Sequence, residues 1–274
     1  MIFAGLQLRL RSRTEEEKLF FHEATRFGLP SYDNLLFRSN YIASYDNRLK
    51  QPVWVLEYLK HERLTLVNAE KNPRYTFSPD WSIHRFFRSR DHDYKYSDYD
   101  RGHLAPACDN MAFQRMLDES FLFSNVAPQV PNLNQGGCPW TRLEGYALYL
   151  ARRSKKVYIV TGTLHLPVDG KLTNSTEDEE NVVSYRVIGS NRVAVPTHFY
   201  KILVKENNHG RLSMEGFLVP NRMDVDRLAK LEEFQIDIDT DLPLIEQASG
   251  LTFYGLLDRK EVIRPRKVQY GFGG

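Results

Sequence analysis

Four consecutive residues, Asp100, Arg101, Gly102 and His103, bring a carboxylate, a guanidinium and an imidazole into one short stretch. The apolar segment that follows, residues 104–107, contains a proline and has little side-chain freedom. An imidazole titrates near neutral pH and can take a proton from water, so His103 is a candidate general base. Asp100 is a candidate for orienting the turn, and Arg101 for contacting a substrate anion.

The other histidines lack such a neighbourhood. None of them has the spacing to a cysteine or to another histidine that zinc sites use. We expect a buried position for His198, which lies in a strand pattern, and surface positions for most of the rest. The surface group is His22, His61, His92 and His209, and the undecided pair is His84 and His165.

A second polar stretch, residues 124–135, contains several amide side chains and leads into a helix that carries Trp140 and Glu144. Oxygen ligands of this kind suit Mg²⁺, which keeps most of its waters and takes one or two protein ligands. Asn134 is the candidate for a direct ligand, and Glu144 for orienting bound water. Helix capping and loop hydrogen bonds explain the same asparagines without a metal, and for this stretch taken alone they are the favoured explanation.

Length and composition are ordinary for a globular protein, with 274 residues of which 42% are hydrophobic and 26% are charged. The net charge of +2 does not by itself indicate a nucleic-acid partner, so a polyanionic substrate would have to meet a local basic patch. No stretch has the length of a membrane span. Cys108 and Cys138 form no CxxC pair, and we expect reduced thiols, with a redox-sensitive pair as the lesser alternative.

The elements that must position these residues alternate between helical and strand patterns, with no repeat and no linker between domains. Helices are expected at 15–27, 112–121, 140–153, 225–231 and 242–249, and strands at 41–45, 53–59, 103–107, 121–126, 157–161, 182–188, 193–196, 198–204 and 213–219. Residues 68–102 are expected to form an irregular loop. The pattern predicts one mixed α+β domain at 15–258, between an arm at 1–14 and a basic tail at 259–274.

Several motifs recur in a fixed order along the chain. They are Asp-Arg-Gly-His-Leu-Ala-Pro-Ala at 100–107, Ser-Asn-Val-Ala-Pro-Gln at 124–129, Leu-Asn-Gln at 133–135, Trp140, and Leu-Glu at 143–144. Together they resemble the DNA/RNA non-specific endonucleases with a ββα-metal site. Later segments, at 160–162, 183–189, 193–201 and 248–251, are similar to the mitochondrial endonuclease G branch and its exo/endonuclease G relatives. The resemblance runs from about 28 to 258 and implies a mixed, mostly antiparallel sheet flanked by helices.

The resemblance also implies a role for each matched residue. His103 would be the general base that activates water, Asn134 the direct ligand of Mg²⁺ (or of Mn²⁺ in its place), and Glu144 a residue that acts on water at the metal. Further candidates for the phosphate and substrate environment are Asp100, Arg101, Asn125 and Arg142. The implied reaction is hydrolysis of phosphodiester bonds in DNA and RNA with little sequence preference, leaving 5′ phosphates. A homodimer and a mitochondrial location are implied as well.

Two departures from the family pattern leave alternatives open. The interval from Asn134 to Glu144 is longer than usual because residues 136–139 precede Trp140, and Leu148 stands where the family commonly has an arginine. Both features favour a catalytically weak or inactive nucleic-acid-binding protein as the main alternative. An exonuclease-leaning enzyme is the other, because the family contains both modes. The basic arm is either the remnant of a transit peptide or a surface extension.

Overall fold

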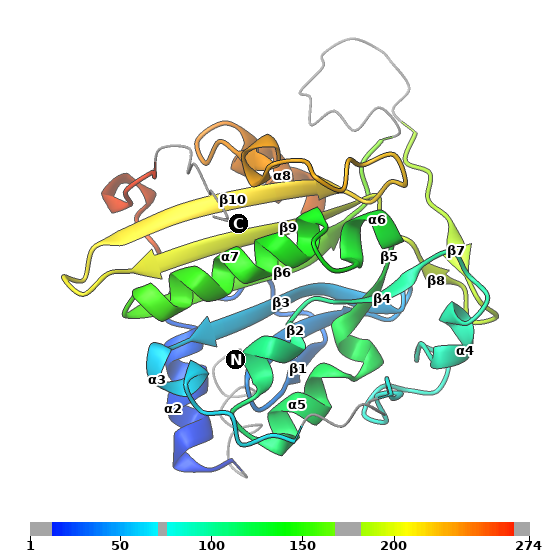
Figure 1. Cartoon of the computed structure of the whole chain (residues 1–274), viewed down its shortest axis with the longest axis horizontal. Helices are drawn as coiled ribbons and strands as arrows, with labels where there is room; N and C mark the ends of the chain where they lie inside the picture. The colour runs from blue at the N-terminus through cyan, green and yellow to red at the C-terminus, as the bar shows by residue number, and fades with distance from the viewer. Residues whose placement is uncertain (1–12, 71–75, 168–181, 266–274) are drawn as a thin grey trace.

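The fold is organised around one seven-stranded sheet in the order β1-β2-β3-β6-β9-β10-β11, and the computed structural model describes residues 13–70, 76–167 and 182–265 (Figure 1). The strands are β1 (Leu35–Phe37), β2 (Tyr41–Asp46), β3 (Gln51–Leu59), β6 (Lys156–Leu164), β9 (His198–Glu206), β10 (Leu212–Pro220) and β11 (Gln235–Ile236). Every neighbouring pair in this sheet is antiparallel. Within the described ranges, parallel pairing is confined to the isolated bridges Ser78–Leu122 and Ser213–Ile263. The expected α+β class with a mostly antiparallel sheet is confirmed.

Each face of the sheet buries its own apolar core. Successive strand residues point to opposite faces, so Trp54 and Leu56 enter one core while Val55 and Leu59 enter the other. The first core is covered by α2 (Glu15–Ala24) and α8 (Asp241–Ser249), and the second by α7 (Pro139–Arg153). Figure 1 shows α7 running across the sheet along β6 and β9.

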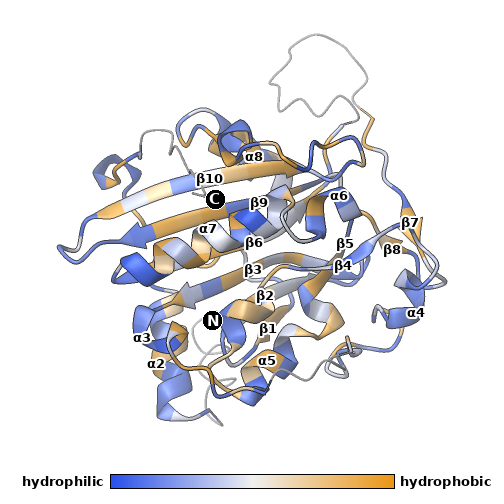
Figure 2. Cartoon of the chain, viewed as in Figure 1, coloured by the Kyte–Doolittle hydropathy of each residue, from blue (hydrophilic) through white to orange (hydrophobic). Residues whose placement is uncertain are grey.

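The long helix α7 covers the sheet because its apolar residues recur at helical spacing. Figure 2 shows hydrophobic and hydrophilic stretches alternating along it. Its buried residues include Trp140, Leu143, Ala147 and Ala151, which share one face. Pro139 occupies the first turn, where a missing backbone N–H removes no helical hydrogen bond.

The remaining elements are short and lie mostly at one end of the sheet. They are α3 (His61–Leu64), α4 (Asp91–Tyr94), α5 (Gln114–Ser120), α6 (Pro131–Asn134), the pair β4 (Asp100–His103) and β5 (Val126–Gln129), the pair β7 (Val187–Ile188) and β8 (Val193–Ala194), and the single 3₁₀ turns Ala107–Asn110, Phe123–Asn125, Leu231–Glu233 and Arg259–Glu261. Among the described residues, no helix combines the length and the apolar character that a bilayer span requires. Both cysteines are free thiols.

Four of the expected elements are wrong in kind or extent. The strand expected at 121–126 is a 3₁₀ turn at Phe123–Asn125 followed by β5, and the Asn125 N–H donates within the turn to the Leu122 carbonyl at 2.8 Å. The strand expected at 103–107 ends at His103, since Pro106 begins the next 3₁₀ turn. Within 182–188 only the last two residues form a strand, and 225–231 forms no helix. The expected arm, to residue 12, and the tail beyond 265 lie outside the described residues, and the boundaries at 15 and 258 stay predictions.

Candidate active site

The hairpin β4–β5 carries the residues from which the chemistry is expected. Gly102 pairs with Ala127 and His103 with Val126. A Cβ atom at Gly102 would lie 2.0 Å from Oε1 of the buried Gln129, so only glycine leaves room for that side chain. The glycine before His103 is therefore required by packing across the hairpin.

The imidazole of His103 packs against two phenylalanine rings, which also contact each other with their centroids 5.1 Å apart. The imidazole centroid is 4.9 Å from that of Phe77 and 5.0 Å from that of Phe121. Nε2 is buried and has no hydrogen-bond partner among the described residues. Burial lowers the pKa of His103 to about 4, so the ring is neutral over the whole physiological range. A neutral imidazole whose nitrogen has no hydrogen-bond partner is able to accept a proton.

Asn125 fixes the backbone that follows His103. Its amide is fully buried, donates to the carbonyls of Ala105 and Ser120 at 2.8 Å, and accepts from the Ala105 N–H at 2.9 Å. All of these partners are backbone groups of the chain itself. The geometry makes Asn125 a positioning residue for the His103 segment rather than a group that faces a substrate.

Asn134 ends the short helix α6 and approaches Asp100 on β4. Its Nδ2 lies 3.3 Å from the Asp100 Oδ2, while its Oδ1 accepts no hydrogen bond from the described residues. That pair offers only oxygen donors to a ligand, which suits Mg²⁺. Nowhere in the described ranges do three His, Cys, Asp or Glu side chains gather as a metal cluster. A cation here would thus rely on one or two protein oxygens, which is the habit of Mg²⁺ and not of Zn²⁺.

The two candidate arginines have different kinds of partner. Arg101 forms an ion pair of 2.6 Å with Asp91 and lies over the Tyr94 ring, and the Asp91 carboxylate is exposed. Arg142 donates to the main-chain carbonyls of Arg227 and Ala229 and so ties α7 to residues 227–229. Arg101 can exchange a solvent-facing carboxylate for another anion, whereas the Arg142 contacts are to backbone alone.

Glu144 lies in a buried group of charges that the sequence did not reveal. Burial raises the pKa of Glu144 to about 7, although Lys201 opposes the shift, and Asp109 adds to it. Burial likewise raises the pKa of Asp109 to about 6 and that of Glu57 well above its ordinary value. Lys201 is the cation of this group; its Nζ donates to Thr161 at 2.6 Å and lies 5.1 Å from the centre of the Trp140 ring.

The extra residues between Asn134 and Glu144 are absorbed before the helix begins. Gly137 takes a positive φ of 81°, and neither Gly136 nor Gly137 has an atom within 4 Å of an added Cβ. Trp140 is fully buried and packs on Phe199 with ring centroids 5.3 Å apart. Since Glu144 lies one turn further along the same helix, Trp140 fixes its position.

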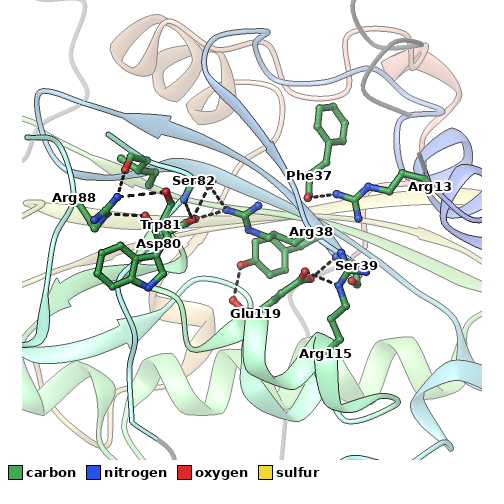
Figure 3. A network of polar contacts seen from close by, with 12 residues as sticks. Arg13, Phe37, Arg38, Ser39, Asp80, Trp81, Ser82, Arg88, Arg115 and Glu119 are labelled. Carbon is green, nitrogen blue, oxygen red and sulfur yellow. Dashed lines mark hydrogen bonds and ion pairs between the residues drawn. The ribbon is translucent and has the colours of Figure 1, made fainter. Parts of the chain in front are cut away.

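A polar network that includes Arg38, Asp80 and Glu119 anchors chain segments next to Phe77 and Phe121 (Figure 3). Arg38 bonds to Asp80 and, at 3.1 Å, to Ser82, which fastens the loop that begins just after Phe77. Although burial opposes it, Arg38 lowers the pKa of Asp80 and keeps that carboxylate charged. On the other side Glu119, two residues before Phe121, accepts from the Ser39 N–H at 2.5 Å and pairs with Arg115. The segments next to the two rings that pack on His103 are therefore both anchored.

Comparison with known proteins gives consistent matches. The family model described as DNA/RNA non-specific endonuclease matches residues 22–259. The mitochondrial endonuclease G of Homo sapiens is 40% identical over 84% of this chain and 73% of its own, and the mitochondrial nuclease EXOG of Danio rerio is 36% identical over 86% and 66%. Nuclease C1 of Cunninghamella echinulata var. echinulata is 35% identical over 85% and 88%. The crystal structure of an EndoG/EndoGI complex superposes with a TM-score of 0.79 at 36% identity, covering 89% of this chain and 95% of that one.

Proposed function

The chain belongs to the DNA/RNA non-specific endonuclease family, and on that premise we propose that it is a Mg²⁺-dependent nuclease that cleaves both DNA and RNA. The observation that carries the proposal is the buried, unpartnered Nε2 of His103, which packs against Phe77 and Phe121. His103 lies on the same short strand as Asp100, the partner of Asn134. A strand that carries an unpartnered imidazole and a member of an oxygen-donor pair supports proton transfer near a bound cation.

In the proposed reaction the Nε2 of His103 takes a proton from water. The water oxygen bonds to phosphorus and the bond from phosphorus to the 3′ oxygen breaks. The departing 3′ oxygen takes up a proton from solvent, so the products carry a 5′ phosphate and a 3′ hydroxyl. Because burial keeps the imidazole neutral, the base is in its accepting form before substrate arrives. Asn125 contributes by fixing the backbone at Ala105, next to the base.

Asn134, with Asp100 beside it, would hold Mg²⁺ through its amide oxygen, which accepts no hydrogen bond from the described residues. When bound, the cation would supply charge stabilisation to the phosphate and its leaving oxygen. Glu144, in its ionised form, would order water on that side. Arg101 would exchange Asp91 for the substrate phosphate, since a guanidinium binds phosphate through charge-assisted hydrogen bonds.

The test is a Mg²⁺ titration of cleavage on circular DNA, linear DNA and RNA. The parent protein should cut all three, while His103→Ala and Asn134→Ala should each lose about 10²- to 10⁴-fold. His209→Ala and Asn208→Ala are matched controls, because both residues are exposed in the turn between β9 and β10. If His103→Ala and Asn134→Ala both retain metal-dependent cleavage, the assignment of this site is wrong.

Leu148 favours an alternative function, that of a nucleic-acid-binding protein without catalysis. It is a half-buried apolar residue on α7, one turn after Glu144, where the family commonly has an arginine. A protein with lost catalysis would bind nucleic acid in a salt-sensitive way and show no turnover at any Mg²⁺ or Mn²⁺ concentration. An exonuclease-leaning enzyme would leave closed circular DNA intact while degrading the linear form.

The names of the relatives also support a location. Endonuclease G of Homo sapiens and EXOG of Danio rerio are both named as mitochondrial, and we infer the same compartment for this protein. Fractionation of cells that express the natural full-length protein tests this inference. Recovery outside the mitochondrial fraction would contradict it.

We further propose a homodimer, on the ground of the family resemblance. The exposed side chains of Trp81 and Phe86 lie on the loop that Arg38 and Asp80 anchor, and they would be covered in such an assembly. Light scattering should give twice the 32.0 kDa mass of one chain. A Trp81→Arg variant that stays dimeric would place the interface elsewhere, and a monomeric parent would refute the dimer.

A further inference from the structure

A cavity of about 470 Å³ opens beside the beginning of β4. The side chains that give it chemical character are Tyr99, Tyr185, Arg186, His198, Asn221 and Arg222. Among the described residues that line it, none is acidic. Two guanidinium groups and aromatic rings without a carboxylate suit an anionic, ring-containing ligand.

The cavity is rigidly joined to the hairpin that carries His103. Asn221 accepts from the Val130 N–H at 2.9 Å and donates to the Pro128 carbonyl at 3.0 Å, so it clamps one wall to β5. Tyr99, which also lines the cavity, directly precedes Asp100 at the start of β4. His103 is four residue steps after Tyr99, which is about 13 Å along an extended strand. A strand of nucleic acid with its scissile phosphate at His103 can therefore reach this cavity with a nucleotide a few positions away.

The two arginines are available to an anion. Arg186 is exposed and has no ion-pair partner among the described residues. Arg222 pairs with Asp224 at 3.1 Å, but both side chains are more than half exposed, so a phosphate can replace that carboxylate at little cost.

The aromatic side chains of the cavity are also available to a ligand. Tyr185 is 42% exposed, and its ring is held edge-on by His165, with centroids 4.6 Å apart. Burial and the nearby Arg222 keep His198 neutral by lowering its pKa to about 4. A fixed and partly exposed tyrosine ring gives a nucleobase a surface on which to stack, whatever the base is.

We propose that this cavity is a nucleotide subsite, which binds one unpaired nucleotide of the substrate strand with its phosphate on Arg186 and Arg222 and its base against Tyr185. The inference rests on the proposed function and adds to it a preference for substrate that is single-stranded or that has frayed ends. The chemistry is shared by DNA and RNA, because it uses a phosphate and the face of a base.

Binding is measured in the His103→Ala background, without divalent metal, by fluorescence anisotropy of a labelled oligothymidylate at several salt concentrations. Arg186→Ala and Arg222→Ala should each weaken binding about tenfold and lower the salt slope by about 0.7 per lost phosphate contact. Tyr185→Ala should weaken binding at least about fivefold with an unchanged slope, and Tyr185→Phe should restore it. Arg211→Ala, an exposed arginine at the far β9–β10 turn, is the control of equal charge.

Equal affinity and salt slope for Arg186→Ala, Arg222→Ala and Arg211→Ala would overturn the subsite. An equal loss on a blunt duplex and on the single strand would overturn the requirement for an unpaired nucleotide. Hydrolysis with His103 intact separates this inference from the proposed function. The subsite variants should raise KM for the oligonucleotide and leave a small nitrophenyl phosphodiester unaffected, whereas failure of the proposed function would appear as no hydrolysis of either substrate by the parent.

Discussion

The two ionisable groups expected to act on the phosphate, His103 and Glu144, are both half-buried, in surroundings of opposite character. His103 packs against hydrocarbon rings, and desolvation alone accounts for its shifted pKa. Glu144 lies among other ionisable side chains, with Asp109 and Lys201 acting on it in opposite directions. We call the apolar surroundings of His103 the apolar wall, and the charged surroundings of Glu144, formed by Asp109, Glu57 and Lys201, the charged wall.

Burial pushes both groups toward their uncharged forms, but the consequences differ. The pKa of His103 falls to about 4, which leaves the base ready to accept a proton at every pH above that value. The pKa of Glu144 rises to about 7, so its carboxylate is lost as pH falls through neutrality. We therefore expect the pH dependence of cleavage near neutrality to come from Glu144 and not from His103.

Among the substitutions that leave His103 in place, Glu144→Gln is expected to have the largest effect. At pH 8 the variant should be about 100-fold slower, because the charge that orders water is gone. Between pH 8 and pH 5 the parent should lose activity as Glu144 takes up a proton, while the variant should show no such limb near pH 7. Profiles of kcat/KM against pH measure this, and an identical limb in both proteins would remove Glu144 from the pH dependence.

Lys201→Met should sharpen the contrast by removing the cation of the charged wall. The Glu144 pKa should rise, so the activity limb moves to higher pH, and Asp109→Asn should move it the other way. Stability should fall by about 3 kcal/mol at pH 8, where the carboxylates are left without their cation, and by less at pH 5, where they are protonated. Urea denaturation at the two pH values measures the loss. An equal loss at both would show that Lys201 acts by packing only.

The smallest effect is expected from Phe77→Leu on the apolar wall. A smaller side chain exposes the His103 ring to water, and its pKa should rise from about 4 toward the ordinary value of about 6.5. Cleavage at pH 8 should stay close to that of the parent, because the imidazole is still neutral there. Titration of the His103 ring followed by NMR tests this directly. An unchanged pKa would mean that Phe77 does not keep water from the ring.

The sequence named the two paired segments around His103, but not the rings of Phe77 and Phe121 that pack on the imidazole. The residues at 100–107 and 124–129 form the two strands of one hairpin and the turns beside them, so their order along the chain carries their geometry. The role of Asn125 required the structure, since its partners are backbone groups that no residue type reveals.

The charged wall was not predictable in the same way. Glu57, Asp109 and Lys201 come from β3, from the turn after β4 and from β9, and only the pairing of β3, β6 and β9 brings them near Glu144. In the sequence Glu57 and Lys201 are single charges within apolar strands, a pattern that ordinarily marks a solvent-facing position. Both are buried at the sheet face beneath α7.

Imidazole rescue of the His103→Ala protein tests the central claim most directly. The truncation leaves a space beside the Phe77 and Phe121 rings, where the lost imidazole packed. We expect Mg²⁺-dependent cleavage of plasmid and RNA by the variant to fall about 10³-fold. Added imidazole should restore cleavage in a saturable manner. Pyrrole should not, because it lacks a basic nitrogen. Undiminished cleavage by His103→Ala, or equal effects of imidazole and pyrrole, would contradict the claim.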